Sequence, residues 1–308
     1  MESIVRVEHL SHRYTVDWAI QDINFEVNRK GILGLLGSNG AGKSTTMNII
    51  CGVLNQTDGT VYINGIDTRK NSVEAKKNIG FLPQKPPLYP DHTVDEYLTF
   101  AAEMRLMDPK KIKQAVEIAK ERCSIAHFSK RLIRNLSGGY QQRLGIAQAI
   151  VHNPKFVVLD EPTNGLDPNQ ILEIRKLIKE IAVDHAVLLS THILSEVQAM
   201  CDDIKMIEHG HLVFSGTLEE FDNYVKPDTF IVKLDNPPAD EDLLAIPGVV
   251  RLKHLDKRVQ FDKREDITEV VANACVHGGW GLCEITLERI SLEEIFAQLS
   301  GKRLIDKF

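Results

Sequence analysis

A glycine-rich segment at residues 37–45 contains the residues with the clearest chemical meaning. Its three glycines let backbone N–H groups turn toward phosphate oxygens, and a helix beginning here adds the partial positive charge of its N-terminus. Lys43 supplies a mobile cation, and the Ser44 hydroxyl can ligate a Mg²⁺ ion that bridges the phosphates. The segment therefore predicts a nucleotide-binding P-loop of the form GxxxxGK[ST]. Its members are Gly37, Ser38, Asn39, Gly40, Ala41, Gly42, Lys43, Ser44 and Thr45.

Two carboxylates at the end of an apolar strand add hydrolytic chemistry. Residues 156–160 form the predicted strand, and Asp160 and Glu161 stand next to each other at its end. In a P-loop fold this position places Asp160 beside the Mg²⁺ and Glu161 next to the terminal phosphate. Glu161 can then act as a general base if a water molecule lies within about 3 Å of it. His192 follows the next strand and is a candidate for holding the phosphate and the water in line.

A second glycine turn distinguishes this chain from other P-loop proteins. A P-loop alone is common to kinases, GTPases and many ATPases. Here Leu136-Ser137-Gly138-Gly139-Tyr140-Gln141-Gln142-Arg143 leads into a helix, and Ser137 stands 100 residues after Gly37. One nucleotide does not need two phosphate cradles from one chain. Because all these motifs occur in the family's order, residues 4–220 resemble the ATP-binding subunit of an ATP-binding-cassette (ABC) transporter.

The resemblance implies roles for further residues. Tyr14 is expected to stack on adenine, Gln84 to touch metal and water, and Asp167 to lie in a loop that crosses a dimer interface. The second glycine turn is expected to contact the γ-phosphate held by the other subunit's P-loop, through Ser137, Gly138 and Gly139. The implied metal ligands are Ser44, Gln84 and Asp160.

The resemblance also implies an assembly. Two copies, or this chain and a second ATPase subunit, are expected to sandwich ATP and Mg²⁺ and to drive separate integral membrane permease subunits. The chain itself is then expected to be cytoplasmic and peripheral on the inner face of the cell membrane. Tyr140 departs from the glutamine that is usual after the signature glycines. Ser-Gly-Gly-Tyr is similar to the drug-resistance and lipid-type exporter branch, which implies export.

Soluble, non-transport ABC ATPases are the alternative. The translation-factor type resembles tandem cassettes, whereas this sequence contains one P-loop and one signature turn. The DNA-repair type carries long coiled coils between the two motifs, and the interval here has no sustained heptads. The net charge of −6, from 37 Lys+Arg and 43 Asp+Glu, also argues against bulk attraction to nucleic acid. We expect no nucleic-acid partner.

The elements that must position these residues follow an α/β pattern. Apolar runs rich in Val, Ile and Leu alternate with helical patterns between residues 31 and 208, which predicts βα units around a mostly parallel sheet. The clearest strands are predicted at residues 32–36, 156–160 and 186–190. Residues from about 88 to 150 are mainly helical and predict a helical subdomain inserted into the sheet domain. The resemblance implies the mixed sheet of an ABC cassette.

The length of 308 residues allows a second domain. We expect an ABC ATPase domain at residues 1–222 and an accessory domain at residues 228–308. The latter has the pattern β-α-β-β-α-β, which predicts a small α+β, ferredoxin-like module, followed by a helix from Ser291. No apolar window is long enough for a membrane helix. The five scattered cysteines are interpreted as buried thiols.

Overall fold

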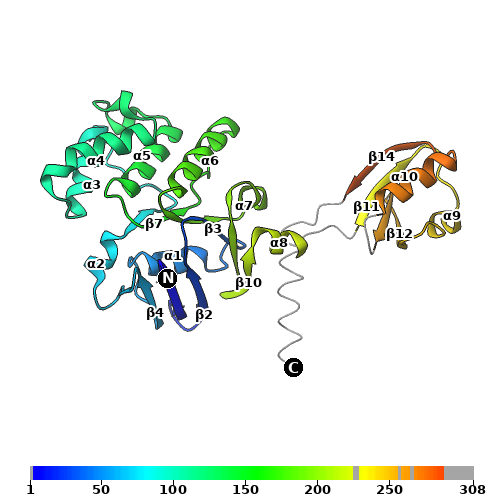
Figure 1. The fold of residues 1–308 in the computed structure, drawn as a ribbon, viewed down its shortest axis with the longest axis horizontal. Helices are drawn as coiled ribbons and strands as arrows, with labels where there is room; N and C mark the ends of the chain where they lie inside the picture. Colours follow the sequence, from blue (N-terminus) through cyan, green and yellow to red (C-terminus); the bar gives the residue numbers. More distant parts are fainter. Residues whose placement is uncertain (1–2, 225–228, 256–257, 264–266, 288–308) are drawn as a thin grey trace. The chain divides into compact units, whose positions relative to one another are not determined.

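The computed structural model describes residues 3–224, 229–255, 258–263 and 267–287. The chain divides into two compact units, and the division falls after Leu218 (Figure 1). The first unit carries every candidate site residue and is described first. Helix α8 (Leu218–Tyr224) begins at the division between the two units.

A mixed six-stranded sheet forms the centre of the first unit. Five of its strands run parallel to one another, and the sixth, β10, pairs antiparallel with β9 at one edge. Strands β7 and β8 are buried along their whole length, which is why they read as continuous apolar runs. In order across the sheet, the strands are β10 (His211–Thr217), β9 (Asp203–Glu208), β3 (Gly31–Leu36), β8 (Ala186–Thr191), β7 (Phe156–Asp160) and β6 (Ile79–Leu82).

A second, antiparallel sheet lies beside the first. Buried side chains alternate with more exposed ones along parts of β1 and β2, as expected of a sheet with one face on the core, and the alternation breaks where the register shifts. The β1 register pairs Val5 with Val27 of β2 and with Ile63 of β4. In order, its strands are β2 (Trp18–Val27), β1 (Val5–Arg13), β4 (Asp58–Ile63) and β5 (Ile66–Asp67).

Helices cover both faces of the mixed sheet. On one face, Leu33 and Leu35 of β3 join an apolar cluster with Met47 of α1 (Lys43–Ile50). Helix α1 also contacts β2, so it lies between the two sheets. On the opposite face, α6 (Pro168–Ala182) and α7 (Leu194–Met200) contact β3 and β8. A short helix, α2 (Ser72–Lys77), precedes β6.

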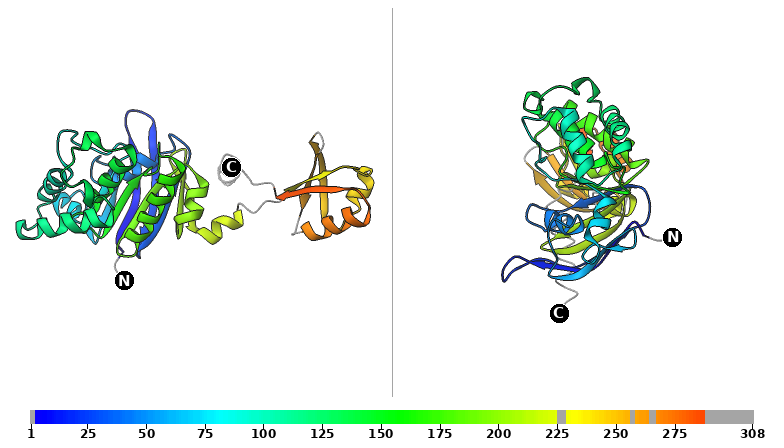
Figure 2. Two further views of the ribbon diagram at one scale, coloured as in Figure 1. Left: turned by 90° about the horizontal axis from the view of Figure 1, so that it is seen from above. Right: turned by 90° about the vertical axis from the view of Figure 1, so that its left-hand side faces the viewer.

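A group of helices is inserted between β6 and β7, as predicted for residues 88–150. Figure 1 and both views of Figure 2 show them gathered at one end of the first unit. A capping box of Thr93 and Glu96 begins α3, and Asp108 caps α4. Lys120 of α4, only 1% exposed, donates to Asp95, Glu117 and Ser129 and so ties these elements together. The elements are α3 (Val94–Met104), α4 (Pro109–Arg122), η1 (Ala126–Phe128), η2 (Ile133–Asn135) and α5 (Gly138–Ile150).

From Thr229 onward, the described residues of the second unit form a four-stranded antiparallel sheet and two helices. Its elements follow the order β-α-β-β-α-β on which the ferredoxin-like interpretation rests, and its strands lie in the order β12-β13-β11-β14. Phe230, Val232, Leu243 and Val271 are buried together in its core. The elements are β11 (Thr229–Leu234), α9 (Asp240–Leu244), β12 (Val249–Leu255), β13 (Arg258–Lys263), α10 (Thr268–His277) and β14 (Leu282–Leu287).

Three remaining expectations concern the whole chain. Among the residues that the structure describes, none of the helices combines the length and apolar character needed to cross a bilayer. Four of the five cysteines are buried, but Cys283 is exposed, so the expectation of a buried thiol is wrong there. It stands on β14, where successive side chains point to opposite faces of the sheet. The helix predicted from Ser291 lies outside the described residues.

Candidate active site

The P-loop joins the end of β3 to the start of α1, and its backbone packs too closely for larger residues. A Cβ atom on Gly37 would lie 2.2 Å from the carbonyl oxygen of Ile207. Gly42 has a φ of 110°, which favours glycine, and a Cβ there would lie 2.9 Å from the Ala19 carbonyl oxygen. These contacts keep the loop curled at the N-terminus of α1, where an anion is stabilised.

Lys43 is only 6% exposed and lies over this loop. Its Nζ donates to the carbonyl oxygens of Gly37, at 2.9 Å, and Ser38, at 3.0 Å. Burial lowers the pKa of Lys43, while the nearby charges of Glu161 and Asp160 act in the opposite direction. The ammonium group is therefore already held at the phosphate cradle by the loop's own carbonyls.

Gln84, Glu161 and His192 come together although they follow three different strands. Gln84 Nε2 donates to Glu161 Oε2 at 2.9 Å, and His192 Nδ1 lies 2.9 Å from Glu161 Oε1. Because β6, β7 and β8 are parallel neighbours, their carboxyl ends meet at one edge of the sheet. The geometry thus places an amide and an imidazole on the two oxygens of one carboxylate.

The backbone of Glu161 is held in an uncommon conformation. Its φ of 47° lies in the left-handed region, which costs a non-glycine residue free energy. The Glu161 N–H donates to the carbonyl oxygen of Ser190 at 3.2 Å and to its Oγ at 3.1 Å. Strain of this kind persists only where surrounding contacts enforce it, and such positions concentrate at functional sites.

Asp160 faces the interior beside Glu161 and is buried. Ser190 Oγ donates to its Oδ1 at 2.5 Å. In the described part of the chain, no group of three His, Cys, Asp or Glu side chains is arranged to hold a metal by itself. A site with one or two carboxylates, a serine hydroxyl and phosphate oxygens nevertheless fits Mg²⁺, which keeps few protein ligands. The Ser44 hydroxyl and Asp160 supply donors of that kind.

Tyr14 lies just beyond β1 and is 63% exposed. Its hydroxyl lies 3.2 Å from Thr45 Oγ1, at the start of α1, and its ring packs edge-on against His12, with centroids 4.7 Å apart. These contacts hold an open aromatic face close to the P-loop, which suits stacking with a flat base.

The second glycine turn begins α5 in the helical insertion, away from the P-loop in the sheet layers (Figure 1). Ser137 is the N-cap residue, and its side chain is exposed. Gly139 packs against α6, because a Cβ there would lie 2.8 Å from the Gln170 side chain. The N–H of Gln170 in turn donates to Asp167, which caps α6. The structure therefore places Gly139 beside the first turn of α6, which Asp167 caps.

Comparison with known proteins identifies the family. A family model for ABC transporters matches residues 20–164. The bacitracin transport ATP-binding protein BcrA of Bacillus licheniformis is 30% identical, over 98% of this chain and 98% of that protein. YxlF of Bacillus subtilis, an uncharacterized ABC transporter ATP-binding protein, is 33% identical over 75% of this chain and 77% of that protein. The chain belongs to the ABC transporter family.

Solved structures agree with this assignment. The cbiO1 protein of Clostridium perfringens, part of the ABC transporter complex cbiONQ, superimposes with a TM-score of 0.66 and 29% identity. The match covers 72% of this chain and 92% of that one. The chain is accordingly the ATP-binding subunit of an ABC transporter, an ATPase that binds nucleotide. The predicted ABC cassette, with a mixed sheet and helical insertion, is confirmed.

Two residues of this ABC site were not predicted from the sequence. Asn164 Nδ2 donates to Glu161 Oε2 at 3.2 Å, from the turn that follows β7. Ser190 contacts both Asp160 and the Glu161 backbone from the neighbouring strand. The polar residue three positions after Glu161 was a usable signal for Asn164. The only sequence signal for Ser190 was its place at the end of an apolar strand.

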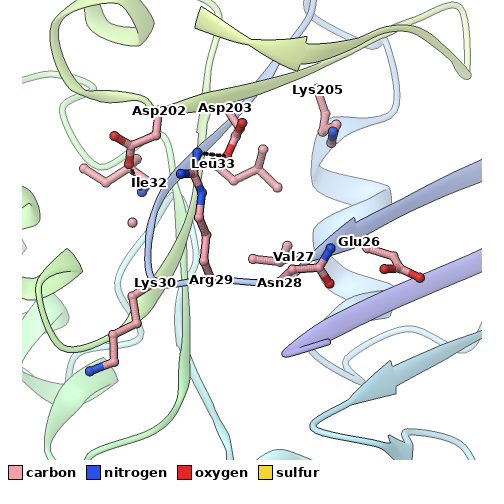
Figure 3. A pocket seen from close by; sticks show the side chains of 11 residues that line it. Glu26, Val27, Asn28, Arg29, Lys30, Ile32, Leu33, Asp202, Asp203 and Lys205 are labelled. Carbon is pink, nitrogen blue, oxygen red and sulfur yellow. Dashed lines mark hydrogen bonds and ion pairs between the residues drawn. The ribbon is translucent and has the colours of Figure 1, made fainter. Parts of the chain in front are cut away.

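A polar cavity of 340 Å³ elsewhere in the ABC ATPase is not this site. It lies at the beginning of β3, whereas the P-loop follows the end of that strand. Figure 3 shows Asp202 accepting from the Ile32 N–H and Arg29 pairing with Asp203 across the cavity. Nucleotides bind at the carboxyl ends of parallel strands in such folds, so this cavity is at the wrong end of the sheet.

Proposed function

We propose that this ABC ATPase powers export through separate membrane permease subunits, as a dimer that closes on ATP and Mg²⁺ and opens after hydrolysis. The partner ATPase is a second copy of this chain or a related subunit. Export is supported by BcrA and by the linearmycin resistance ATP-binding protein LnrL of Bacillus subtilis, which is 29% identical over 98% of this chain. Both names denote transport of, or resistance to, antibiotics.

The dimer is supported by the separation of two phosphate-binding features within one chain. Each ATP would lie between Lys43 and Ser44 of one subunit and Ser137 and Gly139 of the other. Ser137 is exposed at the start of α5 and belongs to the helical insertion, which leaves its hydroxyl available to a partner. The packing of Gly139 on α6 would bring Asp167 to the same interface.

Binding of the nucleotide would involve the P-loop and one aromatic ring. Tyr14 would stack on adenine, and the N–H groups of the loop would bind the phosphates. Mg²⁺ would be held by Ser44, Asp160 and Gln84 and would neutralise charge on the phosphate oxygens. The residues of the loop are Gly37, Ser38, Asn39, Gly40, Ala41, Gly42, Lys43, Ser44 and Thr45.

The arrangement around Glu161 carries the proposed chemistry. Its carboxylate would accept the proton of the attacking water, while His192 and Gln84 orient the water and the γ-phosphate. Gln84, Asn164 and His192 fix the two carboxylate oxygens from different directions, so the base does not need to be ordered when the substrate arrives. Oε2 already accepts from both Gln84 and Asn164, whereas Oε1 contacts His192 alone and so retains a lone pair for the incoming proton.

Coupling to the permease would use the helical insertion. Exposed apolar side chains stand on α3 and in the segment before it: Tyr89 packs edge-on against Phe100 of α3, and Met104 at the end of the helix is also exposed. These side chains follow Gln84 closely in the chain. A permease segment docked on them would therefore respond when the contacts of Gln84 change during ATP binding and hydrolysis. This contact would hold the subunit at the inner face of the cell membrane. We assign residues 1–222 to the ATPase domain and residues 228–308 to an accessory domain.

Replacement of one carboxylate tests the chemistry. Glu161→Gln keeps the shape of the side chain but removes the base, so turnover should fall by about 100-fold or more. ATP affinity and ATP-dependent dimerisation should be retained. Glu180→Gln, the same replacement at an exposed position of α6, should leave turnover unchanged. Near-normal ATPase activity of Glu161→Gln would remove Glu161 from this role.

The transport proposal needs a separate experiment. The complex of this chain with its co-purifying permease would be reconstituted in vesicles, with the ATPase subunit on the outside. Export corresponds to ATP-dependent movement of bacitracin or linearmycin into these vesicles, and Glu161→Gln should abolish it. ATP hydrolysis that neither depends on a permease nor moves any such solute would contradict the proposal.

A further inference from the structure

We propose that Glu208 is a positioning residue of the ATPase reaction, because its carboxylate fixes Ser38 of the P-loop and thereby orients Lys43. This inference rests on the nucleotide-binding role proposed for the P-loop. Glu208 stands at the end of β9 and is 170 residues from Ser38 in the sequence. Their contact is made by the parallel pairing of β3 with β9.

The carboxylate of Glu208 uses both oxygens on one residue. Ser38 Oγ donates to Oε1 at 2.8 Å, and the Ser38 N–H donates to Oε2 at 3.2 Å. Glu208 is only 7% exposed, so water competes little for these bonds. Hydrogen bonds with an ionised partner are stronger than neutral ones, and a two-point contact also fixes direction. The contact therefore fixes the orientation of the Gly37–Ser38 peptide group, which joins the Gly37 carbonyl to the Ser38 N–H.

Lys43 depends on that peptide. Its Nζ donates to the Ser38 carbonyl oxygen at 3.0 Å and to the Gly37 carbonyl oxygen at 2.9 Å. Rotation of the Gly37–Ser38 peptide group would move the Gly37 carbonyl oxygen, one of the two acceptors that hold the ammonium group. The side chain of Glu208 thus acts on Lys43 through Ser38, without touching the nucleotide.

The turn after Glu208 is also hydrogen-bonded to the P-loop and to β2. The Gly210 N–H donates to the Ala41 carbonyl oxygen at 3.0 Å, and the Gln21 N–H donates to the Gly210 carbonyl oxygen at 2.8 Å. The close approach of Gly37 to the Ile207 carbonyl oxygen adds a steric limit. The β9–β10 turn is therefore a fixed support, and Glu208 can position the loop against it.

A simple charge effect of Glu208 and a positioning role predict opposite changes in ATP affinity, so a substitution can distinguish them. A carboxylate near the phosphate cradle repels ATP, so its neutralisation would tighten binding if Glu208 were only a nearby anion. If Glu208 positions the loop, Glu208→Gln loses the ionised two-point contact and binding weakens. Tighter ATP binding by Glu208→Gln would therefore indicate simple charge repulsion, and weaker binding would indicate a positioning role.

The experiment measures the Kd of the full chain for a non-hydrolysable ATP analogue with Mg²⁺ by calorimetry, and KM and kcat for ATP. Glu208→Gln should raise Kd and KM by about 5- to 10-fold, the expected effect of losing a charge-assisted hydrogen bond. At saturating ATP, kcat should stay within about twofold, because the base is untouched. Ser38→Ala should raise Kd in the same direction, and the double variant should be no worse than the weaker-binding single variant.

Asp203→Asn is the matched control, because it removes the same charge from the opposite end of β9, at the cavity in Figure 3. Its Kd should be unchanged. Tighter or unchanged binding by Glu208→Gln, or additive effects in the double variant, would overturn the inference. Should Glu208→Gln fail to fold, Glu208→Asp replaces it, because aspartate keeps the charge but is too short for the two-point contact: its Kd should rise, and an unchanged Kd would overturn the inference. The P-loop role would fail separately, if Lys43→Ala bound the analogue as well as the wild type.

Discussion

A histidine beside β6, the edge strand of the main sheet, should make the first unit sensitive to mild acid. His152 follows α5, and its Nε2 lies 3.0 Å from the carbonyl oxygen of Ile79 at the start of β6. Its Nδ1 is shielded from water and finds no hydrogen-bond partner among the described residues. Burial lowers the pKa of His152 from 6.5 to about 4, and the positive charge of Arg105 acts in the same direction.

The sign of the effect follows from where the proton binds. Between pH 6.5 and pH 4 the unfolded chain protonates His152 and the folded protein does not, so falling pH favours unfolding. The stability is complete above about pH 6.5 and is lost progressively toward pH 4. For folded and unfolded pKa values of about 4 and 6.5, the free energy of unfolding falls by about 2 kcal/mol between pH 7 and pH 5.

His152→Gln should remove this part of the pH dependence, because glutamine stays neutral and can still donate to Ile79. The free energy of unfolding would be measured in urea at pH 7 and pH 5 in a Trp280→Phe background. Trp18 is then the remaining tryptophan, and it reports on the first unit alone. The difference in the free energy of unfolding between the wild type and His152→Gln isolates His152 from the other titrating groups. These include His185, because burial lowers its pKa as well.

The exposed His127 provides the control, and His127→Gln should keep the full acid sensitivity of the wild type. The expected result is that His152→Gln loses about 2 kcal/mol less than the wild type between pH 7 and pH 5. An equal loss in both proteins would refute the reasoning, because it would show that His152 binds its proton as readily in the folded state as in the unfolded one.

Three further predictions concern single contacts. Lys43→Ala should weaken ATP binding, and unchanged affinity by calorimetry would count against the P-loop role. Tyr140 packs edge-on against Phe128, with ring centroids 4.6 Å apart. Tyr140→Gln should therefore lower the melting temperature, whereas Tyr140→Phe should keep it. Equal melting temperatures of the two variants would show that the ring contact is unimportant. Lys120→Met should lower the free energy of unfolding, measured in urea, by about 2 kcal/mol, because buried charge-assisted hydrogen bonds are lost. An unchanged free energy of unfolding would show that Lys120 does not stabilise the packing of the inserted helices.

Much of the fold was predictable because the signals are local. The strands at residues 156–160 and 186–190 are apolar on both faces, and the structure buries them on both. The region expected to be helical, residues 88 to 150, forms helices in the structure, and the capping groups Thr93 and Asp108 define the first turns of α3 and α4. These features depend on neighbours in the chain, so they can be recognised without the tertiary structure.

The antiparallel sheet of β1, β2 and β4 was not among the predicted strands. Its register between β1 and β2 is interrupted three times, at irregularities between Val7 and Arg13 on β1, which breaks the simple alternation that marks a strand. Pairing with β4 joins Val5 to Ile63, far along the chain. The sheet is determined by long-range pairing, for which a local pattern carries little information.

By itself, the sequence determined which residues carry the chemistry: the glycine loop with Lys43, the acid pair ending with Glu161, and the turn at Ser137. The tertiary structure decided what holds them. Asn164 and Ser190 reach Glu161 through a turn and a neighbouring strand, and Glu208 reaches the P-loop across 170 residues. A motif is a property of adjacent residues, whereas its support comes from strands that pair only when the sheet has formed.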